Sequence, residues 1–246
     1  MLSMPATVAH ALARVQERID DTCHAVGRDR ATVRLLLATK TRSADVVREA
    51  LRSAPAGALL IGENRVQELV EKAPALADLQ VTAHLIGPLQ SNKINHALRA
   101  LALHGHACVE TIDSLELAAK LSARVGAGSP LVPLDVMIQV NVSGEESKAG
   151  VAPDRAVDLA HEVADLPGLA LQGFMTIASP TLDERVARAE FELLRSVRDR
   201  VTGSGAAATA LAQELSMGMS RDLEWAVAEG ATIVRVGSAV FGARPS

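Results

Sequence analysis

Short apolar segments alternate eight times with amphipathic segments along the chain. The apolar segments are rich in Val, Ile and Leu, have the length of β-strands, and lie at 33–38, 58–62, 83–87, 107–111, 134–140, 171–177, 213–217 and 232–237. In the amphipathic segment before the seventh of them, Phe191, Leu194 and Val197 recur at three residues and so share one helical face. Eight consecutive strand–helix units predict a parallel sheet closed into a barrel, with the helices outside.

A doubly wound open sheet is the alternative arrangement for such units. It normally has fewer strands and a glycine-rich turn after the first one, whereas here the first apolar segment runs into the sequence LATKTR. The sequence therefore favours an α/β fold built as a single-domain (β/α)8 TIM barrel. A helical pattern from about residue 6 to 26 predicts an additional N-terminal helix, across the barrel bottom or on its flank. We expect one domain over 1–246, with the leading helix in 1–30 and the barrel in 31–244.

Composition limits the kinds of partner. The net charge of −4 and the sequence pI near 6.0 argue against binding to nucleic acid or to an anionic membrane. No apolar run approaches the roughly 18 residues of a membrane-spanning helix, and the first residues carry charges at helical spacing, unlike a signal peptide. The two cysteines are far apart and form no CxxC motif, which is typical of free thiols in a reducing compartment. We expect a cytoplasmic protein and, because no extra apolar face stands out, a monomer.

The first strand ends at a lysine, Lys40, directly after a nearly continuous apolar run over 35–38. Functional side chains in barrels lie at the carboxyl ends of the strands. Two interpretations of Lys40 are open. The commoner one is a strand end that reaches solvent. The other is an amine held partly desolvated at the barrel mouth, where a lowered ammonium pKa frees it to attack a carbonyl carbon and form a Schiff base.

Two short loops combine glycine with serine after the seventh and eighth strands. SMGMS at 216–220 opens a helix, and Gly237 with Ser238 follows the last strand. Backbone N–H groups at such positions favour an anion, and many barrels bind phosphate in these two loops. Each loop alone is typical of an ordinary turn, but the pair predicts a phosphate site.

Arg235 lies within the last strand, between two valines. Pointing outward, it would pair with a helix carboxylate. Pointing inward, it would be a fixed cation that sets the protonation of a neighbouring heterocyclic nitrogen. We predict no metal site, because His104 and His106 precede a strand without a nearby Cys or carboxylate partner. The absence of a GxSxG motif argues against a serine hydrolase.

Several motifs together resemble the pyridoxal phosphate homeostasis family. They are LLLATKTR at 35–42, IGENRVQEL at 61–69, HLIGPLQSNKIN at 84–95, QVNVSGEESKAG at 139–150, GFMTIA at 173–178, ELSMGMS at 214–220 and VGSAVFG at 236–242. The resemblance covers about residues 33–242 and implies a pyridoxal 5′-phosphate (PLP) fold-type III barrel, like the N-terminal domain of alanine racemase. It also implies that the chain holds PLP as a Schiff base and takes part in storing and delivering it, without established catalytic turnover.

The same resemblance implies the cofactor-binding residues. They are Lys40 as the Schiff-base amine, Asn64, His84 and Met175 around the ring, Ser216, Gly218, Ser220, Gly237 and Ser238 at the phosphate end, and Arg235 facing the pyridine nitrogen. Thr39, Pro88 and Arg221 stand where other residues are commoner in the family. None of these departures removes a group that the covalent linkage needs.

The composition also bears on catalysis. A barrel racemase needs a second acid or base on the opposite face of PLP and takes it from a tyrosine of an added domain, whereas this chain has no tyrosine. An arginine beside the pyridine nitrogen weakens the ring as an electron sink. We therefore expect a carrier of PLP and not an enzyme. The alternatives are a weak PLP-dependent amino-acid racemase, and an aldolase-type barrel that uses Lys40 without PLP.

A second lysine, Lys148, lies in the polar SGEESKAG loop. A solvated surface role is the default for such a residue. Family analogy adds the hypothesis that Lys148 takes up PLP in transit toward PLP-dependent apo-enzymes, which would be transient partners.

Overall fold

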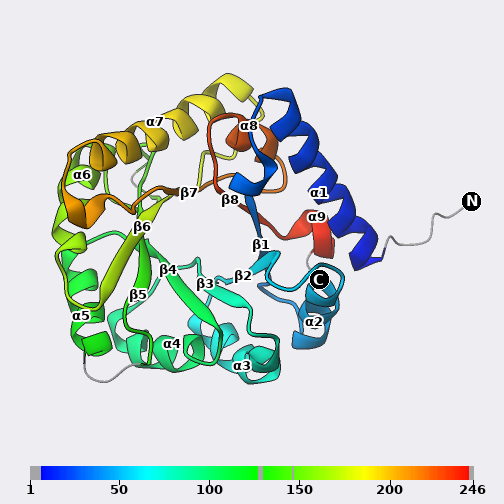
Figure 1. Ribbon diagram of the computed structural model, residues 1–246, viewed down its shortest axis with the longest axis horizontal. Coiled ribbons are helices and arrows are strands. Elements are labelled where there is room, and N and C mark those ends of the chain that lie inside the picture. The colour runs from blue at the N-terminus through cyan, green and yellow to red at the C-terminus, as the bar shows by residue number, and fades with distance from the viewer. Residues whose placement is uncertain (1–6, 127–129, 146, 244–246) are drawn as a thin grey trace, which may run out of the picture.

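The computed structural model describes residues 7–126, 130–145 and 147–243, and its strands form one closed parallel barrel in the order β1 to β8 (Figure 1). The strands are β1 Arg34–Ala38, β2 Leu59–Glu63, β3 Thr82–Leu85, β4 His106–Ile112, β5 Leu134–Gln139, β6 Leu169–Met175, β7 Glu214–Ser216 and β8 Ile233–Val236. Each overlaps the range predicted for it, and β1 pairs with β8 to close the ring. The (β/α)8 prediction is confirmed.

Helices connect the strands on the outside of the barrel (Figure 1). The α-helices are α1 Val8–Ala25, α2 Ala44–Arg52, α3 Val66–Leu76, α4 Ile94–Leu101, α5 Leu115–Gly126, α6 Pro153–Ala164, α7 Glu184–Thr202, α8 Leu223–Ala228 and α9 Ser238–Phe241. Short 3₁₀ turns lie at Arg30–Thr32, Ala77–Leu79, Ser91–Lys93 and Ala207–Thr209. Within the described parts of the chain, none of the helices combines the length and the apolar character that a membrane crossing needs.

Strand alternation divides the apolar side chains into two clusters. One residue set points outward and forms the large core between the barrel and its helices. The other set fills the barrel interior and consists of Leu36, Leu60, Ile86, Cys108, Met137, Met175 and Ile233. In the parallel register Arg235 of β8 is level with Leu36 of β1, so its side chain enters the barrel. The inward orientation is thus the one adopted by Arg235.

The leading helix α1 lies on the flank of the barrel and does not cross its bottom. It packs against α8, α9 and α2, as the dark-blue helix beside them in Figure 1 shows. Its buried residues Leu12, Val15, Ile19 and Cys23 recur at three or four residues and form one face. The N-cap Thr7 accepts a hydrogen bond from His10 N through its side chain, which stabilises the first turn.

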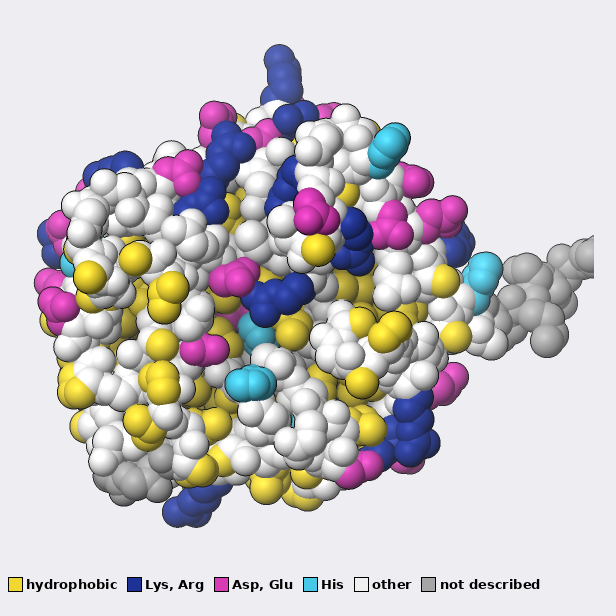
Figure 2. Space-filling view, in the orientation of Figure 1, with side chains coloured by type: hydrophobic (Ala, Val, Ile, Leu, Met, Phe, Trp, Pro, Cys, Tyr) yellow, Lys and Arg dark blue, Asp and Glu magenta, His cyan; other side chains and the backbone are white. Residues whose placement is uncertain are grey.

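Figure 1 presents the amino ends of the strands to the viewer, because right-handed β-α-β units run clockwise only from that side. Figure 2 shows acidic, basic and histidine side chains around a hollow at the centre of this face. At this end of the barrel Arg34, which begins β1, pairs with Glu214, which begins β7, at 2.7 Å. A polar layer therefore covers the amino end of the barrel, and the candidate site lies at the opposite end.

Candidate cofactor site

A cavity of about 540 Å³ lies at the carboxyl ends of β1, β6, β7 and β8. This volume is in the range of small-molecule sites. The residues predicted from the sequence that line it are Lys40, Ser220, Arg235, Gly237 and Ser238, and Lys148 lines it as well.

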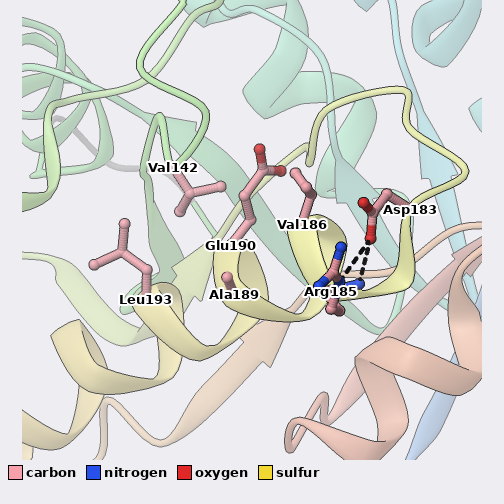
Figure 3. A pocket seen from close by; sticks show the side chains of 7 residues that line it. All are labelled: Val142, Asp183, Arg185, Val186, Ala189, Glu190 and Leu193. Atoms are coloured by element: carbon pink, nitrogen blue, oxygen red, sulfur yellow. Dashed lines mark hydrogen bonds and ion pairs between the residues drawn. The ribbon is translucent and has the colours of Figure 1, made fainter.

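A second, shallower hollow of about 480 Å³ lies against α7 (Figure 3). Its lining is mostly aliphatic, with Val142, Val186 and Leu193 around it. The basic group in it, Arg185, turns back toward Asp183 at 3.8 Å (Figure 3). Because the described residues around this hollow include no amine, thiol or imidazole, the cavity at the barrel end is the candidate site.

The alternation of β1 carries Lys40 to the inner side of the barrel mouth. Ala38 packs against the inner apolar cluster, and Thr39 is fully buried on the outer side. Lys40, one residue further, returns to the inner side and lines the cavity while half-buried. Its amine is therefore placed where a bound aldehyde could react with it.

A buried network holds the guanidinium of Arg235. Its Nη1 donates to Ser216 Oγ at 2.8 Å, and its Nη2 donates to the carbonyl oxygen of Thr176 at 2.6 Å. Ser216 Oγ in turn donates to Glu110 Oε2 at 2.6 Å, and Glu110 Oε1 lies 2.5 Å from His84 Nδ1. All five residues are buried, so the network fixes a cation at the floor of the cavity.

The charges of this network offset one another. Burial works to raise the pKa of the Glu110 carboxyl, but the hydrogen bond and charge of His84, together with Arg235 and Ser216, hold that pKa below its usual value. Burial lowers the pKa of the Arg235 guanidinium, and the charge of Glu110 opposes this. Glu110 is thus the counter-charge that allows an arginine inside the barrel.

The loops after β7 and β8 meet through their serines. Ser220 Oγ accepts hydrogen bonds from Ser238 Oγ at 3.2 Å and from Ala239 N at 3.4 Å. Gly218 has φ +86, and a Cβ added there would lie 2.4 Å from the Cβ of Ala226. The close turn therefore needs glycine at 218, and it brings two hydroxyls and a backbone amide together at one edge of the cavity.

Positive charge dominates the cavity lining. Among the described residues that line it, the acidic one is Asp222 and the cationic ones are Lys40, Arg42, Lys148, Arg221 and Arg235. Although the whole chain carries a net charge of −4, this site favours an anionic ligand.

The known proteins most informative about this site are relatives of nearly full length. The family described as the alanine racemase N-terminal domain matches residues 11–245. A Pseudomonas aeruginosa protein named pyridoxal phosphate homeostasis protein is 45% identical over 240 residues, covering 97% of this chain and 96% of the relative. The chain belongs to the pyridoxal phosphate homeostasis family. An Aquifex aeolicus protein of the same name is 38% identical, covering 95% of this chain and 96% of its own length.

Solved structures agree with this membership. PipY of Synechococcus elongatus, in a structure with PLP bound, has a TM-score of 0.76 at 31% identity, covering 93% of this chain and all of PipY. A protein from Bifidobacterium adolescentis has a TM-score of 0.88 at 40% identity, covering 95% and 94% of the two chains. Alanine racemase from Corynebacterium glutamicum is similar in fold alone, at 14% identity and a TM-score of 0.65, with 96% of this chain matching 62% of that one.

The other predicted site residues do not line the cavity. Gly218 supports the loop below Ser220, and its carbonyl oxygen accepts from Arg235 N at 2.9 Å. Met175 is buried in the inner apolar cluster, while His84 and Ser216 belong to the network beneath Arg235. Ser216 ends strand β7 and does not lie in the loop after it. Asn64 follows β2 and packs its backbone against Gly87, where a Cβ would lie 1.9 Å from Asn64 O.

Sequence reasoning missed Glu110, which links His84 to Ser216. The signal that could have found it is its position two residues after the inward-facing Cys108, which places a carboxylate on the inner side of a strand whose centre is otherwise apolar. The ion-pair cluster of Glu63 with Lys72 also went unpredicted, although GENRVQEL was noted as a motif. The described residues contain no group of three or more His, Cys, Asp or Glu side chains that could hold a metal ion.

Helix α1 contacts the loop after β7, which carries Ser220, through Arg18. Its Nη2 donates to the carbonyl oxygen of Ser220 at 3.1 Å, and its Nε and Nη2 hold Glu224 at 2.6 and 2.9 Å. The helix outside the eightfold repeat is therefore bonded to the loop that carries Ser220.

We expect Arg18→Ala to weaken the binding of phosphate-bearing ligands about fivefold, the equivalent of roughly 1 kcal/mol, which is the usual net contribution of one hydrogen bond. The reason is that the backbone at Ser220 loses its tie to α1. Equilibrium titration with PLP measures this change. Arg14→Ala, one turn earlier on the exposed face of α1, is the matched control and should leave the affinity unchanged. Equal losses in the two variants would contradict a role for the Arg18 contact.

Proposed function

We propose that this protein binds PLP in the cavity at the barrel end, holds it covalently on Lys40, and stores and delivers it in PLP homeostasis. One observation carries the proposal: a single cavity is lined by the amine of Lys40, the fixed cation of Arg235 and the serine pair Ser220–Ser238. The names of the relatives and the PLP-bound structure of PipY support it.

The residues present fit the cofactor. PLP supplies an aldehyde that condenses with a primary amine and releases water. The hydroxyls of Ser220 and Ser238, with the amide of Ala239, would bind the phosphate. The guanidinium of Arg235, held by Ser216 and Thr176, would face the ring nitrogen and donate to it without protonating it.

Absorption spectroscopy tests the proposal. Apo-protein mixed with PLP should develop a visible band, and borohydride should bleach the band and leave the cofactor mass on the chain. Pyridoxal, which lacks the phosphate, should bind more weakly because it cannot use the serine pair. A protein that develops no band and retains no mass after reduction would rule out the covalent carrier, and the aldolase-type alternative would then be tested with PLP-free aldehydes.

The position of the Arg235 guanidinium, held inside the barrel by Ser216 and Thr176, favours the carrier over the weak racemase. A guanidinium keeps the ring nitrogen unprotonated, and the chain contains no tyrosine to act on the opposite face of the ring. Racemisation requires repeated removal of the Cα proton of an amino acid. Sustained deuterium exchange at Cα of added amino acids, in the presence of bound PLP, would favour the racemase instead.

We expect Lys148→Ala to slow the transfer of PLP to an apo-enzyme about threefold to tenfold, while the band at Lys40 stays. Lys148 lines the same cavity, and its Nζ lies 2.8 Å from Glu145 and 3.5 Å from Ser179 Oγ. A second amine in the same cavity could accept the aldehyde as it leaves Lys40. The measurement is the rate at which an apo-enzyme regains activity, with Lys120→Ala as the surface control. An unchanged rate would remove Lys148 from the delivery route.

The proposal extends to the state of the protein in the cell. The whole chain, 1–246, would act as one PLP-binding domain and would be a monomer in the cytoplasm. It would meet PLP-dependent apo-enzymes only transiently, and neither nucleic acid nor a membrane would be a partner. Light scattering of the PLP-loaded protein tests the monomer: a mass of two or more chains would contradict it.

A further inference from the structure

A buried polar cluster lies behind Lys40, on the outer side of the sheet between β1, β2 and α3. It consists of Thr39, Glu63, Glu68 and Lys72, and we name it the outer clamp. Thr39 precedes Lys40 and is fully buried, and Glu63 ends β2 with 2% of its surface exposed. None of these four residues lines the cavity. The outer clamp is therefore separate from the groups that would contact a ligand.

The ammonium of Lys72 is the centre of the outer clamp. It donates to Glu63 Oε1 at 2.7 Å, to the carbonyl oxygen of Thr39 at 2.8 Å and to Glu68 Oε2 at 3.2 Å. Three acceptors use all three protons of the ammonium. Thr39 Oγ1 donates to the same Glu63 oxygen at 2.5 Å. The residue before Lys40 is thus held through both its backbone and its side chain.

The residue after Lys40 is held by the same cluster. Thr41 N donates to Glu68 Oε2 at 2.6 Å. Thr41 has φ +63, a left-handed conformation that a β-branched residue rarely adopts and that surrounding contacts have to maintain. Glu68 therefore bridges Lys72 and the strained backbone at Thr41, so that Lys40 lies between two fixed residues.

Stability alone is a poor reason for this arrangement. Removing two charges from water costs free energy, and the attraction between the charges offsets this cost only in part. Proteins in which apolar side chains replace a buried ion pair are therefore often as stable. Burial raises the pKa of the Glu63 carboxyl, although the hydrogen bonds from Lys72 and Thr39 lower it. In addition, Glu63 Oε2 is buried without a hydrogen-bond partner among the described residues. Such a costly cluster is better explained by the geometry that it imposes on the segment carrying Lys40.

We propose that the outer clamp positions Lys40 for bond formation with the PLP aldehyde, with Glu68 and Lys72 as positioning residues. The inference rests on the function proposed above. In the step concerned, the neutral Nζ of Lys40 adds to the aldehyde carbon, and the aldehyde oxygen leaves as water with both protons of the amine. No oxidation or reduction occurs. None of the four clamp residues lines the cavity, and the clamp acts by fixing the backbone on either side of Lys40.

The test compares two ligands on folded variants. PLP can bond to Lys40, whereas pyridoxamine 5′-phosphate has the same ring and phosphate but an amine in place of the aldehyde. We expect Glu68→Ala and Lys72→Met to slow the appearance of the visible band about tenfold and to weaken PLP binding by a similar factor, because misaligned reacting groups lose rate steeply. Binding of pyridoxamine 5′-phosphate should stay within about twofold of wild type.

Lys120→Met is the matched control, because Lys120 forms an exposed ion pair with Glu116 at the same i,i+4 spacing that joins Glu68 to Lys72. It should leave both ligands unaffected. If Lys72→Met does not fold, Glu68→Ala decides the question, since Lys72 keeps Glu63 as its partner in that variant. Equal losses for both ligands, or an unchanged rate of band formation in Glu68→Ala, would overturn the clamp. A wild-type protein without any band would instead overturn the proposed function.

Discussion

Lys40→Ala should abolish the visible absorption band that forms with PLP, and borohydride should then leave no cofactor mass on the chain. Of the lysines that line the cavity, Lys40 is the one carried there by the alternation of a barrel strand. Alanine removes the amine and leaves the serine pair and Arg235 in place. PLP should therefore still bind without a covalent bond, at least about tenfold more weakly than in the wild type.

Two comparisons make the Lys40 result specific. Lys93→Ala removes a lysine that follows β3, at the end of the 3₁₀ turn Ser91–Lys93, and that does not line the cavity; the band should persist in that variant. Peptide mapping of the reduced wild-type protein should find the cofactor mass on the peptide containing Lys40. Mapping to Lys148 would instead make Lys148 the principal amine of this cavity.

Glu110→Ala should destabilise the apo-protein by about 3–5 kcal/mol, the usual result of removing one member of a buried charge pair. The substitution leaves the guanidinium of Arg235 inside the barrel without its counter-charge, and it leaves Ser216 Oγ and His84 Nδ1 without their carboxylate partners. Urea unfolding followed by circular dichroism measures the loss. Glu116→Ala, which removes an exposed carboxylate, should stay within about 0.5 kcal/mol of wild type.

The Glu110 effect should depend on pH in the acid range. The folded-state pKa of Glu110 is lowered, so its carboxylate contributes stability at pH values above its unfolded pKa of about 4.3. That contribution is lost as the pH falls through the lower folded-state value. The stability difference between wild type and Glu110→Ala should therefore be largest near neutral pH and shrink below about pH 4. A difference that grew on acidification would contradict a charged Glu110 in the folded state.

Loss of Glu110 should also affect the ligand site. Without Glu110, Ser216 Oγ loses the carboxylate that accepts its hydrogen bond, so the hydroxyl that accepts from Arg235 Nη1 is no longer fixed in place. Glu110→Gln keeps a hydrogen-bonding group of the same shape, so it separates the charge from the geometry. If the glutamine variant is as unstable as the alanine variant, the charge is the important property of Glu110.

Much of the fold and part of the site could be predicted because they depend on short stretches of chain. A strand of five residues such as Arg34–Ala38, or a helix with one apolar face such as α1, is visible in its own periodicity. Eight such units in succession allow few arrangements other than a closed barrel. The positions of Lys40, Ser220 and Ser238 were predictable for the same reason. Each follows the carboxyl end of a strand, and in a parallel barrel all the carboxyl ends lie at the same mouth.

The groups that hold the site depend on contacts between distant residues. His84 and Glu110 are 26 residues apart, and Glu110 and Ser216 are 106 apart, so only barrel closure brings the three together. The sequence also left open where α1 packs. Its position on the flank, and the hydrogen bond from Arg18 to Ser220 that follows from it, depend on contacts with distant helices.

The amino-acid sequence by itself thus determined the barrel, the position of Lys40 at the barrel mouth and the two glycine- and serine-containing loops after β7 and β8, because each is encoded by local alternation or turn chemistry. Tertiary structure alone decided that Arg235 points inward with Glu110 as its counter-charge, and that Lys72 fixes the backbone beside Lys40. The physical reason is burial. A charged side chain inside a protein is retained only where partners from several strands surround it, and their identity is settled when those strands pack.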